Sequence, residues 1–238
     1  NFYYKSFDLF VTVSESFRHI VSKKTIGLDR ILTLYNWSMV ERDASSEVTP
    51  HLFENKGTHI VYAGNIGVHQ GLSKLYEGMV NVVKENSAIY FHFFGDGTDF
   101  QVLKDLVGKN NNIILHGRVA STEIGKYLEA ADILFLNLIK EPIYECIIPS
   151  KLQAYVEVGK PILGGLEGEA KNLIMQNNLG EVFEPENIAD FERATLKITS
   201  STIDNIKEIK QRSVDLYAEK FSRKAGVNRL DKFIKKNI

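Results

Sequence analysis

Short apolar runs alternate with longer amphipathic stretches along most of this chain. Apolar runs of about four to eight residues are typical of strands, and amphipathic stretches of about ten or more are typical of helices. Alternation of the two favours a parallel sheet covered by helices on both faces. The pattern therefore predicts an α/β fold with a doubly wound parallel sheet. The predicted strands are 58–64, 89–95, 112–117, 132–138, 161–165 and 181–183, the predicted helices are 70–86, 98–108, 122–130, 150–158 and 169–177, and the chain from residue 187 onward is predicted to be helical.

The first fifty residues follow a pattern of their own. Residues 7–13 read as a strand, and Ser14 reads as the cap of a helix that continues to about residue 22. Residues 30–34 read as a second short strand. Residues 36–56 show no periodicity and include Pro50, which indicates a linker with a domain boundary near residue 50.

Composition narrows the class of protein. The chain has 238 residues, of which 44% are hydrophobic and 25% charged, which excludes disordered, collagen-like and coiled-coil chains. Lys and Arg total 29 against 30 Asp and Glu, so we expect no general surface for nucleic acids. The single cysteine, Cys146, indicates a reducing compartment such as the cytoplasm. We find no signal-peptide pattern, and because residue 1 is Asn we expect a piece of a longer protein.

Ligands of doubly wound sheets bind at the carboxyl ends of the strands, near the point where the strand order reverses. This rule selects the loops at 64–71, 95–98, 117–122, 139–150 and 164–169. The first contains Gly64, Asn65, Gly67 and Gln70 between a strand and a helix. Its spacing is neither that of a dinucleotide loop nor that of a P-loop. Two interpretations stay open, a phosphate-binding loop and a turn whose geometry requires glycine.

A second candidate ligand site lies at the start of the helix that follows the 139–149 loop. Its residues are Pro149, Ser150, Lys151 and Leu152. Ser150 with Gln153 three residues later predicts a capping box. Lys151 in the first turn opposes the helix dipole at a cost of about 0.3–1 kcal/mol. A bound anion would explain that cost, because helix N–H groups and one lysine together can hold a diphosphate.

Carboxylates near this helix, Glu141, Glu145 and Glu157, could accept hydrogen bonds from ribose or sugar hydroxyls, although surface glutamates are common. Glu167 and Glu169 in the next loop have the same two interpretations. The six histidines show no metal-ligand spacing. His92 and His116 fall inside predicted strands, so we expect them to be packed or partly exposed. We find no serine-nucleophile motif.

Four segments together resemble a known family. They are YAGNIGVHQGL (62–72), FFGDGTDF (93–100), LHGRV (115–119) and IPSKLQAYVEVGKPIL (148–163). In this order and at these separations they resemble the C-terminal, nucleotide-sugar-binding domain of GT-B glycosyltransferases of family 4. The resemblance covers about residues 57–230, and it is greatest to the bacterial branch that builds O-antigen, capsule and other surface polysaccharides, including transferases for N-acetylated deoxyamino sugars.

The resemblance implies a Rossmann-like donor domain at 57–238 with C-terminal helices, a linker at 46–56, and a remnant of the N-terminal acceptor domain at 1–45. It implies a retaining hexosyltransferase that takes a UDP-sugar as substrate and needs no metal. The implied acceptor is a glycan or a polyprenyl-diphosphate-linked glycan, with peripheral contact to the inner face of the cell membrane. This chain alone would supply the donor half.

The resemblance also assigns residues, and this sequence departs from the family pattern. Where family members place an Arg and a Lys to hold the diphosphate, the chain has Asn65 and Gln70, so Lys151 becomes the candidate cation. The family's paired glutamates fall on Cys146 and Ala154. We therefore expect Glu145 and Glu157 to replace them, Glu145 with Lys151 at the catalytic centre and Glu157 at the donor. The nucleobase is expected near Arg118, Val119 and Ser121.

Two alternatives to a transferase remain at this stage. A nucleotide-sugar epimerase has the same architecture, although we find no acid–base cluster that would serve it. A non-catalytic nucleotide-binding subunit of a split transferase would explain the neutral Asn65 and Gln70 and the missing glutamates.

Overall fold

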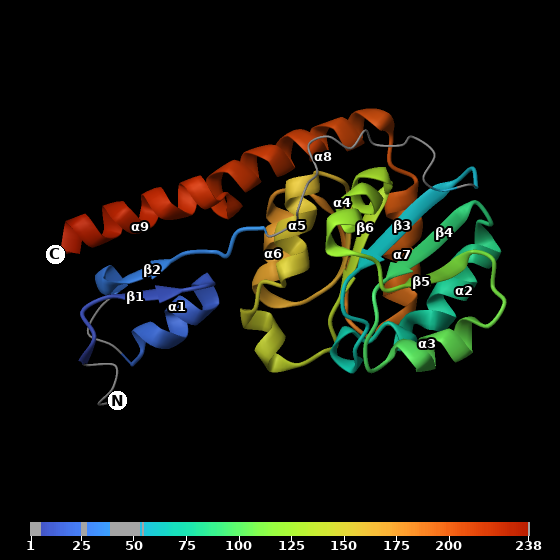
Figure 1. The fold of residues 1–238 in the computed structure, drawn as a ribbon, viewed down its shortest axis with the longest axis horizontal. Coiled ribbons are helices and arrows are strands. Elements are labelled where there is room, and N and C mark those ends of the chain that lie inside the picture. Colours follow the sequence, from blue (N-terminus) through green and yellow to red (C-terminus); the bar gives the residue numbers. More distant parts are fainter. Residues whose placement is uncertain (1–5, 25–27, 39–52, 54, 238) are drawn as a thin grey trace.

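The computed structural model describes residues 6–24, 28–38, 53 and 55–237. Its centre is a parallel sheet with the strand order β5-β4-β3-β6-β7-β8, which confirms the predicted doubly wound fold (Figure 1). The chain starts the sheet in the middle, adds strands to one side and then crosses to the other. The strands are β3 (Thr58–Ala63), β4 (Ile89–Phe94), β5 (Ile113–Gly117), β6 (Ile133–Asn137), β7 (Ile162–Gly165) and β8 (Gly180–Phe183).

Helices cover both faces of the sheet because successive strand residues point to opposite sides. Ile60 and Tyr62 of β3 belong to one buried cluster, and Val61 and Ala63 belong to the other. The first cluster is closed by α2 (Tyr76–Glu85), α3 (Phe100–Val107) and α7 (Ile188–Thr199), and the second by α4 (Ser121–Ala130), α5 (Ser150–Val158) and α6 (Gly168–Gln176).

Most predicted boundaries lie within two residues of the observed ones, with three exceptions. The predicted helix 70–86 begins only at Tyr76, because Gly71 adopts φ +58° between two 3-10 turns, η3 (Val68–Gln70) and η4 (Ser73–Leu75). The predicted loop 139–149 contains a 3-10 helix, η5 (Pro142–Cys146). The predicted strand 7–13 pairs only over β1 (Phe10–Thr12). Most of the predicted linker lies outside the described residues.

An N-terminal βαβ unit lies beside the six-stranded sheet. It consists of β1, α1 (Glu15–Ser22) and β2 (Ile31–Thr33), with β1 and β2 paired in parallel and a 3-10 turn, η2 (Leu28–Arg30), leading into β2. The predicted cap of α1 is confirmed, since Ser14 Oγ accepts a hydrogen bond from the Phe17 amide at 3.1 Å.

The C-terminal helices return the chain to this unit. After α8 (Ile203–Leu216) and a single π-helical turn, η6 (Tyr217–Phe221), α9 (Arg223–Asn237) extends past β2 (Figure 1). The Arg229 guanidinium donates to the Thr33 carbonyl at 2.8 Å. Within the part of the chain that is described, no helix is long and apolar enough to cross a membrane.

Candidate functional site

The two central strands separate at their carboxyl ends, and a tyrosine fills the gap. Ladder pairing between β3 and β6 stops at Val61 and Leu134. Beyond that point the Tyr155 hydroxyl accepts from the Ala63 amide at 3.2 Å and donates to the Phe135 carbonyl at 3.0 Å. Because Tyr155 is on α5, these bonds hold that helix beside the point where the strand order reverses, where such sheets bind ligands.

The loops that follow β3 and β4 are joined backbone to backbone. The Gly64 amide donates to the Phe94 carbonyl at 2.8 Å, and the Ile66 amide donates to the Asp96 carbonyl at 2.9 Å. A Cβ at Gly95, where φ is +139°, would lie 1.8 Å from the Gly64 carbonyl oxygen. Glycine is therefore required there, and the two loops form one rigid wall.

A cavity of about 890 Å³ opens at the carboxyl ends of β3, β4 and β5. Three of the loops selected from the sequence, 64–71, 95–98 and 117–122, contribute to its walls. Five of the predicted donor-binding residues line it together, namely Gly64, Asn65, Arg118, Val119 and Ser121. The other lining residues are Phe94, Gly95, Asp96, Gly97, Ala120 and Ile124.

Lys151 lies against Gly64, which lines this cavity, whereas the predicted residues Pro149, Ser150 and Lys151 are not among the lining residues. A Cβ placed on Gly64 would be 2.6 Å from Lys151 Cε and 3.0 Å from Nζ, so the glycine makes room for the lysine. The ammonium lies 4.9 Å from the centre of the Tyr62 ring. Loss of hydration on burial lowers the pKa of Lys151 to about 8. Among the described residues no carboxylate pairs with this cation.

The predicted capping box at the start of α5 is wrong. Pro149 occupies the N-cap position, and no side chain in the described part of the chain caps the helix. Ser150 is the first helical residue, one position too late to cap. Leu152 is fully buried, so its side chain packs in the core and does not line the cavity. The N-terminus of α5 is thus left electropositive beside Lys151.

Asn65 and Gln70, the neutral residues at the expected cation positions, bond to each other. Gln70 Oε1 accepts from Asn65 Nδ2 at 2.9 Å and from the Gly67 amide at 3.0 Å. Asn137 in turn donates to the Gln70 carbonyl at 2.7 Å. These bonds set the shape of the loop, so Gln70 and Gly67 build the wall beside the cavity and do not line it.

Glu145 and Glu157 lie apart from the other predicted residues. Glu145, in η5, lines a second cavity of about 440 Å³ between α1, η5 and α6. Glu157 is seven residues beyond Ser150 on α5, a separation of about 10 Å along the helix. The structure therefore does not bring these two carboxylates into the 890 Å³ cavity with the donor-binding candidates.

The strand histidines show both of the predicted environments, since His92 is buried and His116 is exposed, and they interact in a way that the sequence did not indicate. His59, His92 and His116 form a ladder across three neighbouring strands, with ring nitrogens 3.0 Å and 2.9 Å apart. Burial, and then the neighbouring histidines, lower the pKa of His92 to about 3, so it is neutral at physiological pH. Within the described residues no group of three or more His, Cys, Asp or Glu side chains could hold a metal ion.

Glu169 is a polar residue to which sequence reasoning gave no special weight. Its carboxylate, at the start of α6, contacts the N-terminal βαβ unit through three hydrogen bonds. The nearest of those partners in sequence is 134 residues away. No local pattern could have indicated this contact.

The structure is similar to solved glycosyltransferases. It superposes on S. aureus TarM (a mutant in complex with fondaparinux, alpha-GlcNAc-glycerol and UDP) with a TM-score of 0.71 and 16% identity, covering 95% of this chain and 43% of that one. A glycosyltransferase from Rickettsia africae gives a TM-score of 0.73 and 16% identity, covering 98% and 65%. Anabaena HepE in complex with UDP and glucose gives 0.70 and 12%, covering 96% and 62%.

The chain thus spans less than two thirds of the length of these proteins. At such identities the likeness shows the GT-B fold. No curated protein matches the chain in sequence. The sequence profile of the family described as glycosyl transferases group 1 matches residues 45–221. The chain belongs to the glycosyl transferases group 1 family.

Proposed function

We propose that this chain is the donor-binding part of a sugar transferase that uses a UDP-sugar. The proposal rests on the position of Lys151. Lys151 is a partly buried cation without a carboxylate partner among the described residues, and it lies between a glycine loop and an uncapped helix N-terminus. A diphosphate would offset the cost of burying that charge and would accept hydrogen bonds from the α5 amides.

The 890 Å³ cavity is the proposed nucleoside site. Its volume is within the range of about 300–1,000 Å³ that is usual for small-molecule sites. Arg118 and Ser121 supply polar groups, and Val119 and Ile124 supply apolar surface against which a base could lie. TarM, HepE and a third structurally similar protein, the pneumococcal O-GlcNAc transferase GtfA, were each solved with UDP, which supports a uridine nucleotide here.

The proposed reaction transfers a sugar from UDP to a hydroxyl of the acceptor. The bond between the anomeric carbon and the diphosphate oxygen breaks, a glycosidic bond to the acceptor oxygen forms, and the acceptor proton is released. Negative charge grows on the departing UDP, where Lys151 and the α5 amides would stabilise it without a metal ion. Retention of anomeric configuration is proposed from the family resemblance. Glu145 would need to reach the donor sugar from the neighbouring 440 Å³ cavity.

For the acceptor we propose a glycan, free or lipid-linked, in surface polysaccharide synthesis, with peripheral contact to the membrane. One structurally similar protein is a lipopolysaccharide outer core galactosyltransferase, WaaB, and another was solved with alpha-GlcNAc-glycerol. Because the chain spans 43% to 65% of the length of these neighbours, the acceptor-binding part of the whole protein would lie largely outside it.

A second candidate is a non-catalytic subunit that binds a nucleotide for a partner enzyme. It is favoured by the positions of Glu145 and Glu157, neither of which lines the nucleoside cavity. Both candidates require UDP to bind at Lys151. Turnover of a UDP-sugar by the whole protein would separate them.

Calorimetric titration with UDP tests the proposal. We expect Lys151→Met to weaken UDP binding about tenfold or more, because it removes the charge but keeps the length of the side chain. Lys84→Met, at an exposed position on α2 away from the cavity, is the matched control and should bind UDP as the unmodified chain does. Equal affinity in all three proteins would remove Lys151 from the site.

A further inference from the structure

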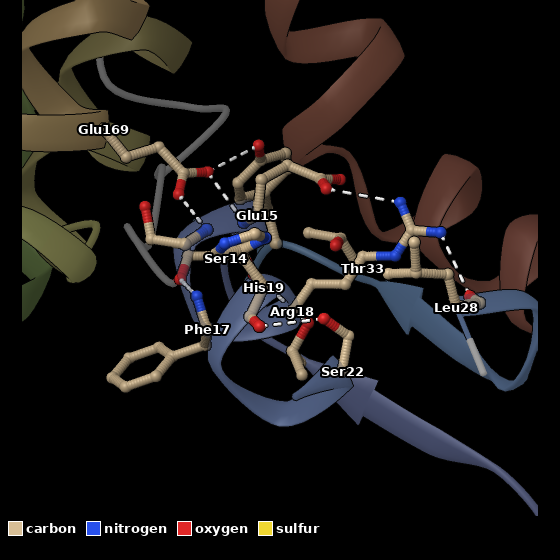
Figure 2. A network of polar contacts seen from close by, with 12 residues as sticks. Ser14, Glu15, Phe17, Arg18, His19, Ser22, Leu28, Thr33 and Glu169 are labelled. Atoms are coloured by element: carbon tan, nitrogen blue, oxygen red, sulfur yellow. Dashed lines mark hydrogen bonds and ion pairs between the residues drawn. The ribbon is translucent and has the colours of Figure 1, made fainter. Parts of the chain in front are cut away.

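Glu169 joins two parts of the molecule that are far apart in sequence. Its Oε1 accepts from the Glu15 amide at 2.9 Å and from the Tyr35 hydroxyl at 2.8 Å, and its Oε2 accepts from the Ser16 amide at 2.8 Å. Figure 2 shows this carboxylate directed at the first turn of α1. An anion is most favourable at that position, because the first amides of a helix lack partners within the helix.

The remaining amide of this turn is also satisfied. Ser14 Oγ accepts from the Phe17 amide and donates to the Cys146 carbonyl in η5 at 2.7 Å. The six-stranded domain thus presents a carboxylate from α6 and a carbonyl from η5 side by side. We call these contacts of Glu169 and Cys146 with the start of α1, together with the hydrogen bond from Tyr35 to Glu169, the Glu169 latch.

Gly168 allows the two latch groups of the six-stranded domain to lie close together. Gly168 adopts φ +62°, and a Cβ there would lie 2.0 Å from the Glu145 carbonyl oxygen. Only glycine lets the η5 backbone approach the start of α6 this closely. The consequence is that the Cys146 carbonyl and the Glu169 carboxylate reach the same helix end.

The βαβ unit has a second attachment to the rest of the chain. The Tyr35 ring packs on Phe221 with ring centres 5.5 Å apart, and Arg229 of α9 bonds to the Thr33 carbonyl. These contacts are formed by η6 and α9 and do not involve α6. Tyr35 takes part in both attachments, through its hydroxyl in the latch and through its ring at Phe221, but the partners outside the βαβ unit are on different elements, α6 and η5 for the latch and η6 and α9 for the α9 attachment. The 440 Å³ cavity adjoins the latch.

We propose that Glu169 is a positioning residue that holds the N-terminal βαβ unit closed against the six-stranded domain, and that the unit pivots on the α9 attachment when the latch opens. Glu169 is half-buried, so water can replace its partners on opening. The latch goes beyond the donor site, since Glu169 does not line the nucleoside cavity. It would set the width of the 440 Å³ cavity between α1, η5 and α6.

The charge state of Glu169 fits this role. Burial alone would raise the pKa of its carboxyl, but the hydrogen bonds from the Ser16 and Glu15 amides and from Tyr35 outweigh burial and hold the pKa below its ordinary value. The carboxylate is therefore ionised at neutral pH and forms charge-assisted hydrogen bonds to the helix.

Amide hydrogen exchange followed by NMR tests the latch directly. We expect exchange at the Glu15 and Ser16 amides to become about tenfold faster or more in Glu169→Ala, and to change less in Glu169→Gln, which keeps one acceptor oxygen. The Arg18 amide, bonded to the Ser14 carbonyl inside α1, should keep its protection. Glu167→Gln is the matched control, because Glu167 is in the same loop and faces Lys140 instead.

A distance measurement separates a latch from a simple helix cap. Spin labels at Lys23→Cys on the βαβ unit and Lys84→Cys on α2, in a Cys146→Ser background, should give longer and broader distances once Glu169→Ala is added. A cap with no positioning role would speed exchange throughout α1 and leave the distance unchanged, and that result would overturn the proposal. If Glu169→Ala fails to fold, Tyr35→Phe removes one latch bond from the other side and should produce a smaller shift in the same direction.

UDP titration of the same variants keeps this inference apart from the donor proposal. We expect Glu169→Ala to bind UDP as the unmodified chain does. Absence of UDP binding in every protein would contradict the donor proposal and leave the latch standing. Unchanged exchange and distance in Glu169→Ala would contradict the latch and leave the donor proposal standing.

Discussion

Two helices of this chain begin in opposite ways. The start of α1 is fully satisfied, by Ser14 from its own segment and by Glu169 from the six-stranded domain. The start of α5 follows a proline that supplies no cap, and the nearby charge is the cation of Lys151. Each helix end favours an anion. At α1 the chain provides that anion itself, and at α5 it adds a second positive group.

The difference separates a contact within the protein, at α1, from the proposed ligand site, at α5. A helix end closed by the protein's own carboxylate gains stability and has no free amide to offer. A helix end left open beside a partly buried cation costs stability, and a bound anion recovers that cost. The comparison predicts that substitutions at α1 change stability and domain position, whereas those at α5 change nucleotide affinity.

Among the residues that bring Glu169 and Cys146 to the start of α1, Gly168 should have the largest effect on stability. We expect Gly168→Ala to lower the free energy of unfolding by about 3 kcal/mol, because the new Cβ meets the Glu145 backbone as well as adopting a strained φ. Gly108→Ala is the matched control, with φ +53° and nothing within 4 Å of the new Cβ, and should cost about 1 kcal/mol. Urea unfolding measures both, and equal losses would show that the close approach of η5 contributes nothing.

Lys151, at the uncapped start of α5, should take up protons when UDP binds. Lys151, with its pKa near 8, is about half deprotonated at pH 8, and a bound diphosphate would restore the proton. Calorimetry at pH 8 in buffers of different ionisation enthalpy should therefore show uptake of up to about half a proton, and almost none at pH 6. Without UDP, the unfolded chain holds a proton between pH 8 and 10.5 that the folded chain has released, so stability should rise with pH in that window. Proton uptake that is absent, or equal at both pH values, would contradict an anion at Lys151.

A pair of serines gives the smallest expected effect and the sharpest contrast. Ser14→Ala removes a cap and should lower the free energy of unfolding by about 1 kcal/mol. Ser150→Ala, at the position that the sequence suggested as a cap, should change it by less than about 0.5 kcal/mol. Thermal unfolding of the two variants measures both changes in the free energy of unfolding. A similar decrease in both would mean that Ser150 caps α5 in solution.

The fold could be predicted because its signal is local. Apolar runs and amphipathic stretches indicated each strand of the six-stranded sheet, and Ser14 indicated the start of α1. Errors arose where one residue changes the local geometry. Gly71 delays α2, and Pro149 takes the cap position from Ser150.

The site could be predicted only in part. Topology brought the loops of Gly64 and Arg118 to one cavity, because the carboxyl ends of parallel strands share one edge of the sheet. The burial of Lys151 beside Gly64, the Tyr155 bridge and the Glu169 latch depend on contacts across the fold. Their partners are 87 to 154 residues apart, so no spacing in the sequence indicates them.

The open start of α5 and the cavity beside it are proposed to form one uridine nucleotide site. Isothermal calorimetry of the unmodified chain with UDP, and with GDP, ADP and NAD as competitors, tests this most directly. We predict that UDP binds and that the other nucleotides bind more weakly, because the cavity selects the base while Lys151 and α5 hold the diphosphate. Failure of UDP to bind, or equal binding of all four, would contradict the account.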